Sequence, residues 1–199
     1  MTPEEAGALL ASEARRFAGF GWMRGTSGNL SLVVSRDPLR LAVTASGRDK
    51  GDLTGTDVVI VDAEGAAVDP AGGRPSAEAA LHAHIATRTG AGAVVHVHTV
   101  AAVAAGSRHP DGVVFEGLEM LKGIGRQASG DVVRVPVVPN SQDMRELASR
   151  FDEAWERDTP ALIVATHGLY AWGADALQAR HHTEIVEWLL ELELETGGR

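Results

Sequence analysis

The stretch Ala93-Val-Val-His-Val-His98 combines a buried strand with two polar side chains. Alternate residues of a strand point to the same side, so His96 and His98 project together at a spacing that suits a shared ligand. An isolated His-x-His pair is more often an ordinary pair of core or surface residues. Here the other residues are apolar, and two inward imidazoles are costly unless they are paired or bind a metal. The stretch therefore predicts a buried strand that carries part of a metal site, because imidazole is a common ligand of zinc and similar ions.

A third ligand is needed, and His167 is the best candidate because it ends an apolar strand and precedes a glycine. The other histidines fit this role less well. His82 and His84 are two apart on an expected helix and therefore face different sides. His181 and His182 are adjacent on the last expected helix, where we expect solvent or an interface around them.

Helices and strands interleave on both sides of this strand. Helices are expected over residues 2–20, 76–89, from the strand end to about 105, 141–157 and 175–195, with a short helix or turn over 116–124. Strands are expected over 30–35, 39–44, 58–62, 93–98, 132–138, 161–166 and 169–172. Thr2, Ser76, Ser141 and Asp175 are the expected N-terminal caps. Several strand pairs are hairpin-like, which favours an α/β fold with a mainly antiparallel sheet layered between helices.

Composition excludes several classes of function. The chain has 199 residues and no linker, which fits a single domain over 1–199. It has no cysteine, so disulfide frameworks, thiolate metal sites and thiol nucleophiles are excluded. Its net charge of −9 disfavours nonspecific nucleic-acid binding. No apolar run approaches the ~18 residues that span a membrane, and no secretory leader is recognisable, so we expect a cytoplasmic protein without a membrane partner.

Two loops rich in small polar residues indicate an anion site. They read Gly25-Thr-Ser-Gly-Asn29 and Thr44-Ala-Ser-Gly-Arg-Asp-Lys-Gly51. Free main-chain N–H groups and hydroxyls form anion-binding concavities, and Lys50 adds positive charge. Each loop alone is more often a simple turn. Together with Arg74-Pro-Ser76 at an expected helix start, whose dipole favours anions, they predict a phosphate pocket.

Two glutamates lie in positions that allow more than one interpretation. Glu78 falls in the first turn of an expected helix, where a carboxylate also simply complements the helix dipole. Glu119 is flanked by apolar residues, and it could equally be a solvated side chain paired with Lys122 three residues on. Spacing alone does not choose between a catalytic and a structural role for either residue.

Five segments occur in the order found in the class II aldolase/adducin family, which the chain resembles from about residue 5 to 195. They are Thr26-Ser-Gly-Asn-Leu-Ser31, Thr44-Ala-Ser-Gly47, Arg74-Pro-Ser-Ala-Glu78, His96-Val-His98 and His167-Gly-Leu-Tyr-Ala-Trp-Gly173. The resemblance implies a layered α/β/α fold and a homotetramer with sites at subunit interfaces. It also implies a small sugar-phosphate substrate and one Zn²⁺ per subunit, held by the two strand histidines and the later one, here His96, His98 and His167.

Three segments resemble, within that family, the dehydratases of methionine salvage. They are Thr44-Ala-Ser-Gly-Arg-Asp-Lys-Gly51, Glu116-Gly-Leu-Glu-Met-Leu-Lys-Gly123 and Asn140-Ser-Gln-Asp-Met144, the last with Ser141 where Asp or Thr is expected. This resemblance implies a lyase that removes water from a 1-phosphorylated 2-ketose, with Glu119 as the acid and base. It leaves the role of Glu78 open, because the family's aldolases use this glutamate as a base whereas some animal dehydratases carry cysteine at the same position.

The site expected from the resemblance therefore has three parts. Catalysis is assigned to Glu119 and Glu78, and the metal to the three histidines. Contacts with phosphate and substrate are expected from Thr26, Gly28, Asn29, Ser46, Gly47, Lys50, Ser76 and Lys122. Glu119 would take the C3 proton and protonate the departing C4 hydroxyl, while the metal acts as a Lewis acid.

Three other functions remain open. A zinc-dependent aldolase of the fuculose-phosphate type would break C3–C4 instead of C4–O, and a sugar-phosphate 4-epimerase of the same family is a further option. A noncatalytic module, like the head domain of adducin, would share only the fold. The histidine triad with a glutamate argues against this last reading.

Overall fold

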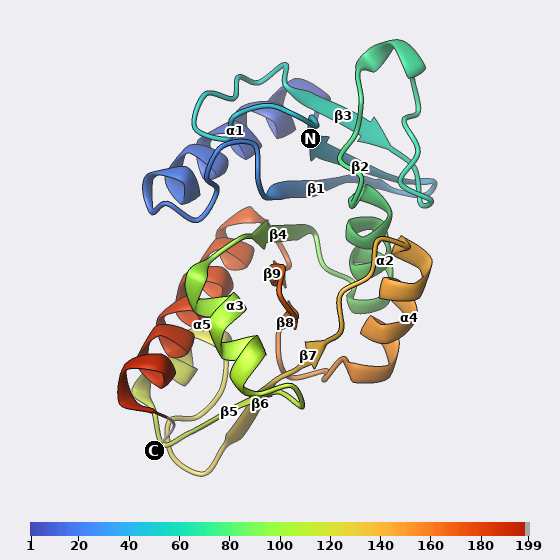
Figure 1. Cartoon of the computed structure of the whole chain (residues 1–199). Helices are drawn as coiled ribbons and strands as arrows, with labels where there is room; N and C mark the ends of the chain where they lie inside the picture. Colours follow the sequence, from blue (N-terminus) through green and yellow to red (C-terminus); the bar gives the residue numbers. More distant parts are fainter. Residues whose placement is uncertain (198–199) are drawn as a thin grey trace.

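Seven strands form the main sheet of the protein, whose computed structural model describes residues 1–197 (Figure 1). In spatial order they are β3 (Val58–Val61), β2 (Leu39–Thr44), β1 (Asn29–Arg36), β4 (Ala93–Val97), β9 (Gly168–Gly173), β8 (Ala161–Val164) and β7 (Val137–Val138). Neighbouring strands are antiparallel, apart from the parallel pair β7 and β8. A separate antiparallel pair contains β5 (Val113–Glu116) and β6 (Val132–Val135). The prediction of a mainly antiparallel sheet is confirmed.

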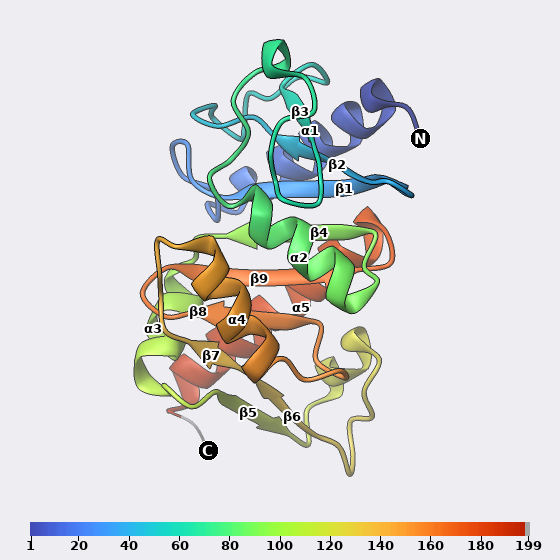
Figure 2. The same cartoon turned by 90° about the vertical axis from the view of Figure 1, so that its right-hand side faces the viewer.

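Helices cover both faces of the main sheet and complete a three-layered arrangement (Figure 2). One layer holds α2 (Ala79–Thr89) and α4 (Met144–Ala154), and the other holds α1 (Pro3–Gly19), α3 (Val100–Arg108) and α5 (Ala176–Thr196). Two short 3-10 helices, η1 (Pro70–Gly72) and η2 (Glu119–Ile124), lie in the connections. Within residues 1–197, no helix has the length and apolar character that crossing a membrane requires.

Strand β4 divides its side chains between the two layers. Ala93, Val95 and Val97 belong to the core beneath α1, α3 and α5, whereas Val94 packs beneath α2 and α4. His96 follows the same alternation and points toward the α2 side. The period of two that defines the strand therefore also decides on which face the histidine lies.

The strand register lines up three residues from distant parts of the chain. His96 in the central strand β4 is paired with Asn29 of β1 on one side and with Tyr170 of β9 on the other. The loop before β1 and the turn before β9 therefore lie at the same end of the sheet.

Two of the expected helix caps are wrong. Thr2 caps α1 through a capping box with Glu5, as expected. Helix α2, however, begins after Glu78 without a side-chain cap, and the Ser76 hydroxyl accepts the N–H of Glu78, which precedes the helix. Asp143 caps α4 in place of Ser141. Ser and Asp are equally good N-caps, so the sequence did not separate neighbouring candidates.

The expected strand 132–138 is divided at Pro136, and its two parts, β6 and β7, join different sheets. Proline lacks the N–H that a continuous ladder needs, so the chain changes partner there. The structure also adds β5, which the sequence did not indicate. His182 is buried and bonds the carbonyl of Trp172, so its expected exposure is wrong.

Candidate metal centre and active site

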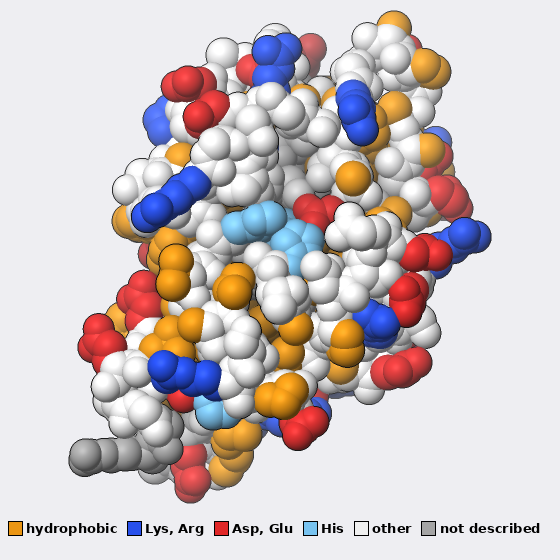
Figure 3. Space-filling model, viewed as in Figure 1, with side chains coloured by type: hydrophobic (Ala, Val, Ile, Leu, Met, Phe, Trp, Pro, Cys, Tyr) orange, Lys and Arg blue, Asp and Glu red, His pale blue; other side chains and the backbone are white. Residues whose placement is uncertain are grey.

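Four side chains bring their ligating atoms within 4.8 Å of one another: Glu78, His96, His98 and His167. Nε2 of His96 lies 2.8 Å from Nε2 of His98 and 3.3 Å from Nε2 of His167. Oε1 of Glu78 lies 3.0 Å from Nε2 of His167. Figure 3 shows histidine side chains near the centre of this face, next to an acidic group.

Each of these residues sits where an element begins or ends. His96 is near the end of β4, and His98 directly follows that strand. His167 lies in the tight turn between β8 and β9, and its N–H bonds the carbonyl of Val164. Glu78 immediately precedes α2. The sheet therefore supplies the histidines from two adjacent strands, and the helix start supplies the carboxylate.

Burial keeps the imidazoles of His96 and His98 unprotonated. It lowers the pKa of His96 to about 3 despite the nearby carboxylate of Glu78, and it also lowers the pKa of His98. Burial acts in the opposite direction on Glu78 and raises its pKa. The electrostatic effect of the His96 ring and hydrogen bonds with His167 and Asn29 outweigh burial, so the pKa of Glu78 lies well below its usual range. Near pH 7 His96 and His98 therefore present neutral imidazoles beside the ionised carboxylate of Glu78.

This arrangement fits a divalent metal ion. Nδ1 of His96 is 3.0 Å from the carbonyl oxygen of Leu169, so Nδ1 carries the proton and Nε2 presents a lone pair toward the cluster. Three Nε2 atoms converge with one carboxylate oxygen, and a cation would satisfy all four at once. Nitrogen and oxygen donors in this number suit zinc and related ions.

The first of the two loops predicted to bind phosphate lies against this cluster. Nδ2 of Asn29 donates to Oγ of Ser76 at 3.1 Å and to Oε2 of Glu78 at 2.5 Å. A Cβ atom on Gly28 would lie 2.9 Å from the carbonyl oxygen of His96, so the first loop packs directly against β4. The first loop and the start of α2 thus meet at the cluster.

Lys50 joins the first loop to the second. It is 2% exposed, and its ammonium group donates to the carbonyl oxygens of Thr26 at 2.9 Å and Arg48 at 2.8 Å. Burial lowers its pKa, against the effects of the carboxylates of Asp49 and Glu78. In the second loop, the N–H of Ser46 bonds the carbonyl of Arg74. Two of the three ammonium protons therefore hold the loops together, and one is left for another acceptor.

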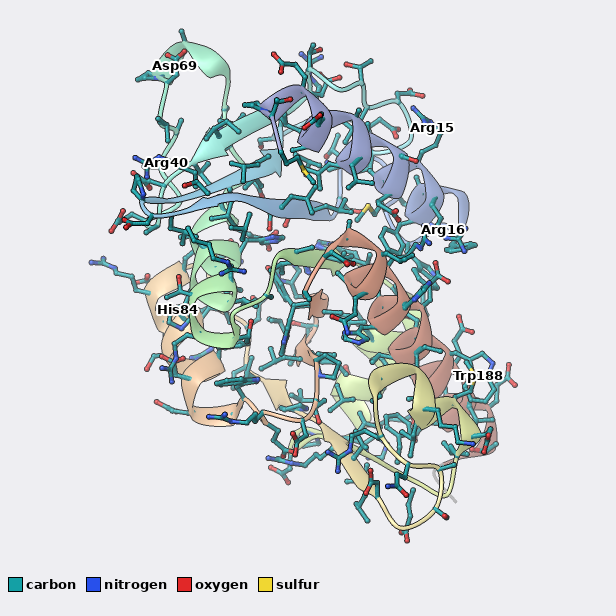
Figure 4. The ribbon with its side chains drawn as sticks, turned by 180° about the vertical axis from the view of Figure 1, so that it is seen from behind. Arg15, Arg16, Arg40, Asp69, His84 and Trp188 are labelled. Carbon is teal, nitrogen blue, oxygen red and sulfur yellow. The ribbon has the colours of Figure 1, made fainter. Side chains whose placement is uncertain are left out.

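Glu119 and Lys122 lie apart from the cluster. They pair with each other on η2 and are largely exposed, with 76% and 62% of their side chains accessible. Helix η2 packs on α5, where a Cβ on Gly123 would lie 2.6 Å from the side chain of Ile185. In Figure 4 the segment 119–124 lies on the rear side together with Trp188 of α5, opposite the histidines of Figure 3. A single chain therefore does not bring these two residues to its own histidines.

Sequence reasoning missed two buried residues beside the cluster. Tyr170 stacks on His96, with ring centroids 4.0 Å apart. His82 lies four residues after Glu78 on α2 and is fully buried. The i, i+4 spacing from Glu78 was the available signal for His82, whereas Tyr170 reaches the cluster only through the pairing of β9 with β4. Burial lowers the pKa of His82 to about 4, whereas burial together with the Glu78 carboxylate raises the pKa of Tyr170 well above its usual value.

The model of the class II aldolase and adducin N-terminal domain matches residues 8–194. The chain belongs to this family. Among its relatives, a protein of Sulfurihydrogenibium sp. named methylthioribulose-1-phosphate dehydratase is 41% identical over 86% of this chain and 81% of its own. A protein of the same name from Geobacillus thermodenitrificans is 39% identical over 93% of this chain and 89% of its own. The resemblance found in the sequence is thereby confirmed.

Solved structures of the family share the fold. YgbL of Escherichia coli, described as a putative aldolase/epimerase/decarboxylase, superimposes with a TM-score of 0.83 at 24% identity and covers 99% of this chain and 92% of its own. An L-fuculose 1-phosphate aldolase gives a TM-score of 0.75 at 24% identity over 97% of this chain and 86% of its own. At these identities the likeness establishes the architecture alone.

Proposed function

We propose that this protein is a methylthioribulose-1-phosphate dehydratase, a lyase of methionine salvage that works in the cytoplasm. Its substrate is 5-methylthioribulose 1-phosphate, and its product is 2,3-diketo-5-methylthiopentyl 1-phosphate. The observation that carries the proposal is the convergence of Glu78, His96, His98 and His167 in a chain about 40% identical to dehydratases of that name. Such a cluster is suited to reactions in which a proton leaves the carbon next to a carbonyl group.

One zinc ion per subunit would be held by His96, His98 and His167, with Glu78 as a fourth ligand or as a base beside them. Bound there, zinc supplies Lewis-acid stabilisation of the negative charge that develops on the substrate's oxygen atoms. The low pKa of Glu78 supports the ligand role, because an ionised carboxylate is what a cation attracts.

The phosphate group would bind where the two loops meet Ser76. The main-chain N–H of Ser46 is already bonded to Arg74, so its hydroxyl and the N–H of Gly47 are the better donors. Asn29 and Gly28 would shape the floor of the pocket beside Thr26. Lys50 contributes a buried positive charge close to the bound anion.

Glu119 would perform the proton transfers from a neighbouring copy of the chain in a homotetramer, together with Lys122. Its exposure on η2, away from its own histidines, supports this assignment. The carboxylate removes the C3 proton. It then returns that proton to the C4 hydroxyl as the C4–O bond breaks, so that water leaves and an enol remains. The enol tautomerises to the 2,3-diketone, which balances the reaction without another reactant.

An aldolase or a 4-epimerase is the second candidate, favoured by the fold shared with an L-fuculose 1-phosphate aldolase. The deciding experiment incubates the purified protein with 5-methylthioribulose 1-phosphate and follows the mass of the product. Loss of one water, abolished by a chelator and restored by zinc, is the expected result. Carbon–carbon bond formation from dihydroxyacetone phosphate and an aldehyde, without any dehydration, would overturn the proposal in favour of the aldolase.

A further inference from the structure

Two fully buried rings are stacked at the metal cluster: the imidazole of His96, which is one of its ligand candidates, and the phenol of Tyr170. Tyr170 of β9 is 0% exposed and stacks on His96, with ring planes inclined by only 11°. The two residues are partners in the register of β9 and β4, so the backbone holds the rings in this contact. The phenol ring therefore limits rotation of the imidazole whose Nδ1 is already bonded to Leu169.

His82 also contacts this tyrosine. Its ring meets that of Tyr170 edge-on, with centroids 5.8 Å apart, and its Nδ1 lies 2.8 Å from the hydroxyl oxygen of Ser31. If the Ser31 hydroxyl donates to Nδ1, the proton of the neutral ring is on Nε2. His82 then offers that N–H at a position one helical turn beyond Glu78.

Asn29, His82 and Tyr170 each have a buried polar atom without a hydrogen-bond partner among residues 1–197, namely Oδ1, Nε2 and the phenol hydroxyl, and the carboxylate of Glu78 influences the pKa of both His82 and Tyr170. Asn29 already donates to Glu78 through its amide nitrogen. Buried polar groups in folded proteins are nearly always hydrogen-bonded. We therefore expect these atoms to gain hydrogen-bond partners when the site is occupied. The groups that surround metal ligands commonly act by orienting them.

We propose that Tyr170 is a positioning residue of the metal centre, which stacks on His96 and donates a hydrogen bond to Glu78 when the metal is bound, with His82 supporting its hydroxyl from behind. In this arrangement the Ser31 hydroxyl donates to His82, the N–H of His82 donates to the Tyr170 hydroxyl, and that hydroxyl donates to the carboxylate of Glu78. This inference rests on the proposed metal site but not on the identity of the substrate.

The substitution Tyr170→Phe tests the hydroxyl, because it keeps the stacked ring. Loss of a partner of this kind typically weakens metal affinity by about 10–100-fold, and we expect a loss in that range when zinc is titrated against a chromogenic chelator. The thermal stability of the metal-free variant should change little, since the hydroxyl has no partner there. Unchanged zinc affinity would overturn the proposal.

Thr183→Val is the matched control. It removes another fully buried hydroxyl, which bonds the carbonyl of Ala179 within α5. We expect this variant to lose thermal stability but to keep its zinc affinity. An equal loss of zinc affinity in both variants would show a general effect of buried hydroxyls and would also overturn the proposal.

A measurement on the unaltered chain avoids any folding defect. Tyr170 is the only tyrosine in the sequence, so tyrosine labelled with ¹³C at the ζ carbon gives a single resonance. We expect this resonance to move when zinc is added, because the phenol gains its hydrogen bond. A resonance that stays in place while zinc binds would contradict the proposal. Both experiments use zinc without substrate, so absence of dehydratase activity would count against the proposed function and leave this inference standing.

Discussion

Nδ1 of His96 lies 3.0 Å from the main-chain carbonyl oxygen of Leu169 on the adjacent strand. A carbonyl oxygen only accepts, so the contact assigns the proton to Nδ1 and leaves the lone pair of Nε2 for a metal. The metal ligand is thus oriented by the backbone of the sheet.

Removing one imidazole should release the metal. We expect His98→Ala to contain far less than one zinc per chain when metal content is measured after dialysis, because one of the converging nitrogen donors is lost. His84→Ala is the control, since His84 lies on α2 outside the cluster and bonds Asp152. Zinc at full stoichiometry in His98→Ala would remove that residue from the ligand set.

Glu119→Gln should lower the turnover number by about 10²–10⁴-fold while zinc stays bound, because a general acid and base is typically worth that much. If Glu119 serves a neighbouring copy, mixed oligomers of Glu119→Gln and His96→Ala chains should regain activity. One type of interface in such oligomers combines intact histidines with an intact glutamate. If the mixed oligomers stay as inactive as the two parent variants, despite verified exchange of subunits, Glu119 does not act on the histidine site of a neighbouring copy.

Gly168→Ala should disturb the turn that carries His167. A Cβ atom at this position would lie 2.3 Å from the carbonyl oxygen of Val97 and 3.2 Å from Cε1 of His96. We expect a loss of about 1–3 kcal/mol in the free energy of unfolding, the usual cost of overpacking, together with weaker zinc binding. Gly19→Ala, at the end of α1, meets no atom within 4 Å and should lose neither stability nor zinc affinity. Equal stability of the two variants in urea titrations would refute the steric argument.

Glu187 should make the protein less stable as the pH rises. Its carboxyl group is fully buried on α5, and burial raises its pKa to about 8, although the hydroxyl of Thr99 donates to it at 2.8 Å. The unfolded chain ionises this group near its ordinary pKa, so the folded state holds one extra proton between about pH 4.5 and 8. Stability from this group is therefore fully present below that window and is lost across it.

Glu187→Gln removes this pH dependence, because the amide resembles the protonated acid and does not ionise. The free energy of unfolding of the variant should match that of the unaltered protein near pH 4.5 and exceed it by about 4 kcal/mol at pH 8, since each unit of pKa shift corresponds to about 1.4 kcal/mol. Chemical denaturation at a series of pH values measures this difference. A difference that is the same at every pH would show that the carboxyl group titrates normally.

The sequence predicted the parts of the site that depend on local periodicity. A strand places alternate residues on one face, which is why His96 and His98 could be paired from their spacing alone. Apolar strands with tight connections likewise predicted a mainly antiparallel sheet. His167 could be chosen because it follows an apolar strand and precedes a glycine.

Tertiary structure decided which groups join these histidines. The residues alone left Glu78 and Glu119 as equal candidates for a catalytic role. The pairing of β1, β4 and β9 and the position at which α2 begins bring Glu78 into the cluster. Glu119 is left exposed on another side of the molecule. The burial of Tyr170 and His82 also depends on packing between segments far apart in the chain. Local sequence determines which way a side chain points from its own element, but the neighbour that it meets depends on long-range strand pairing and helix packing, which no single segment encodes.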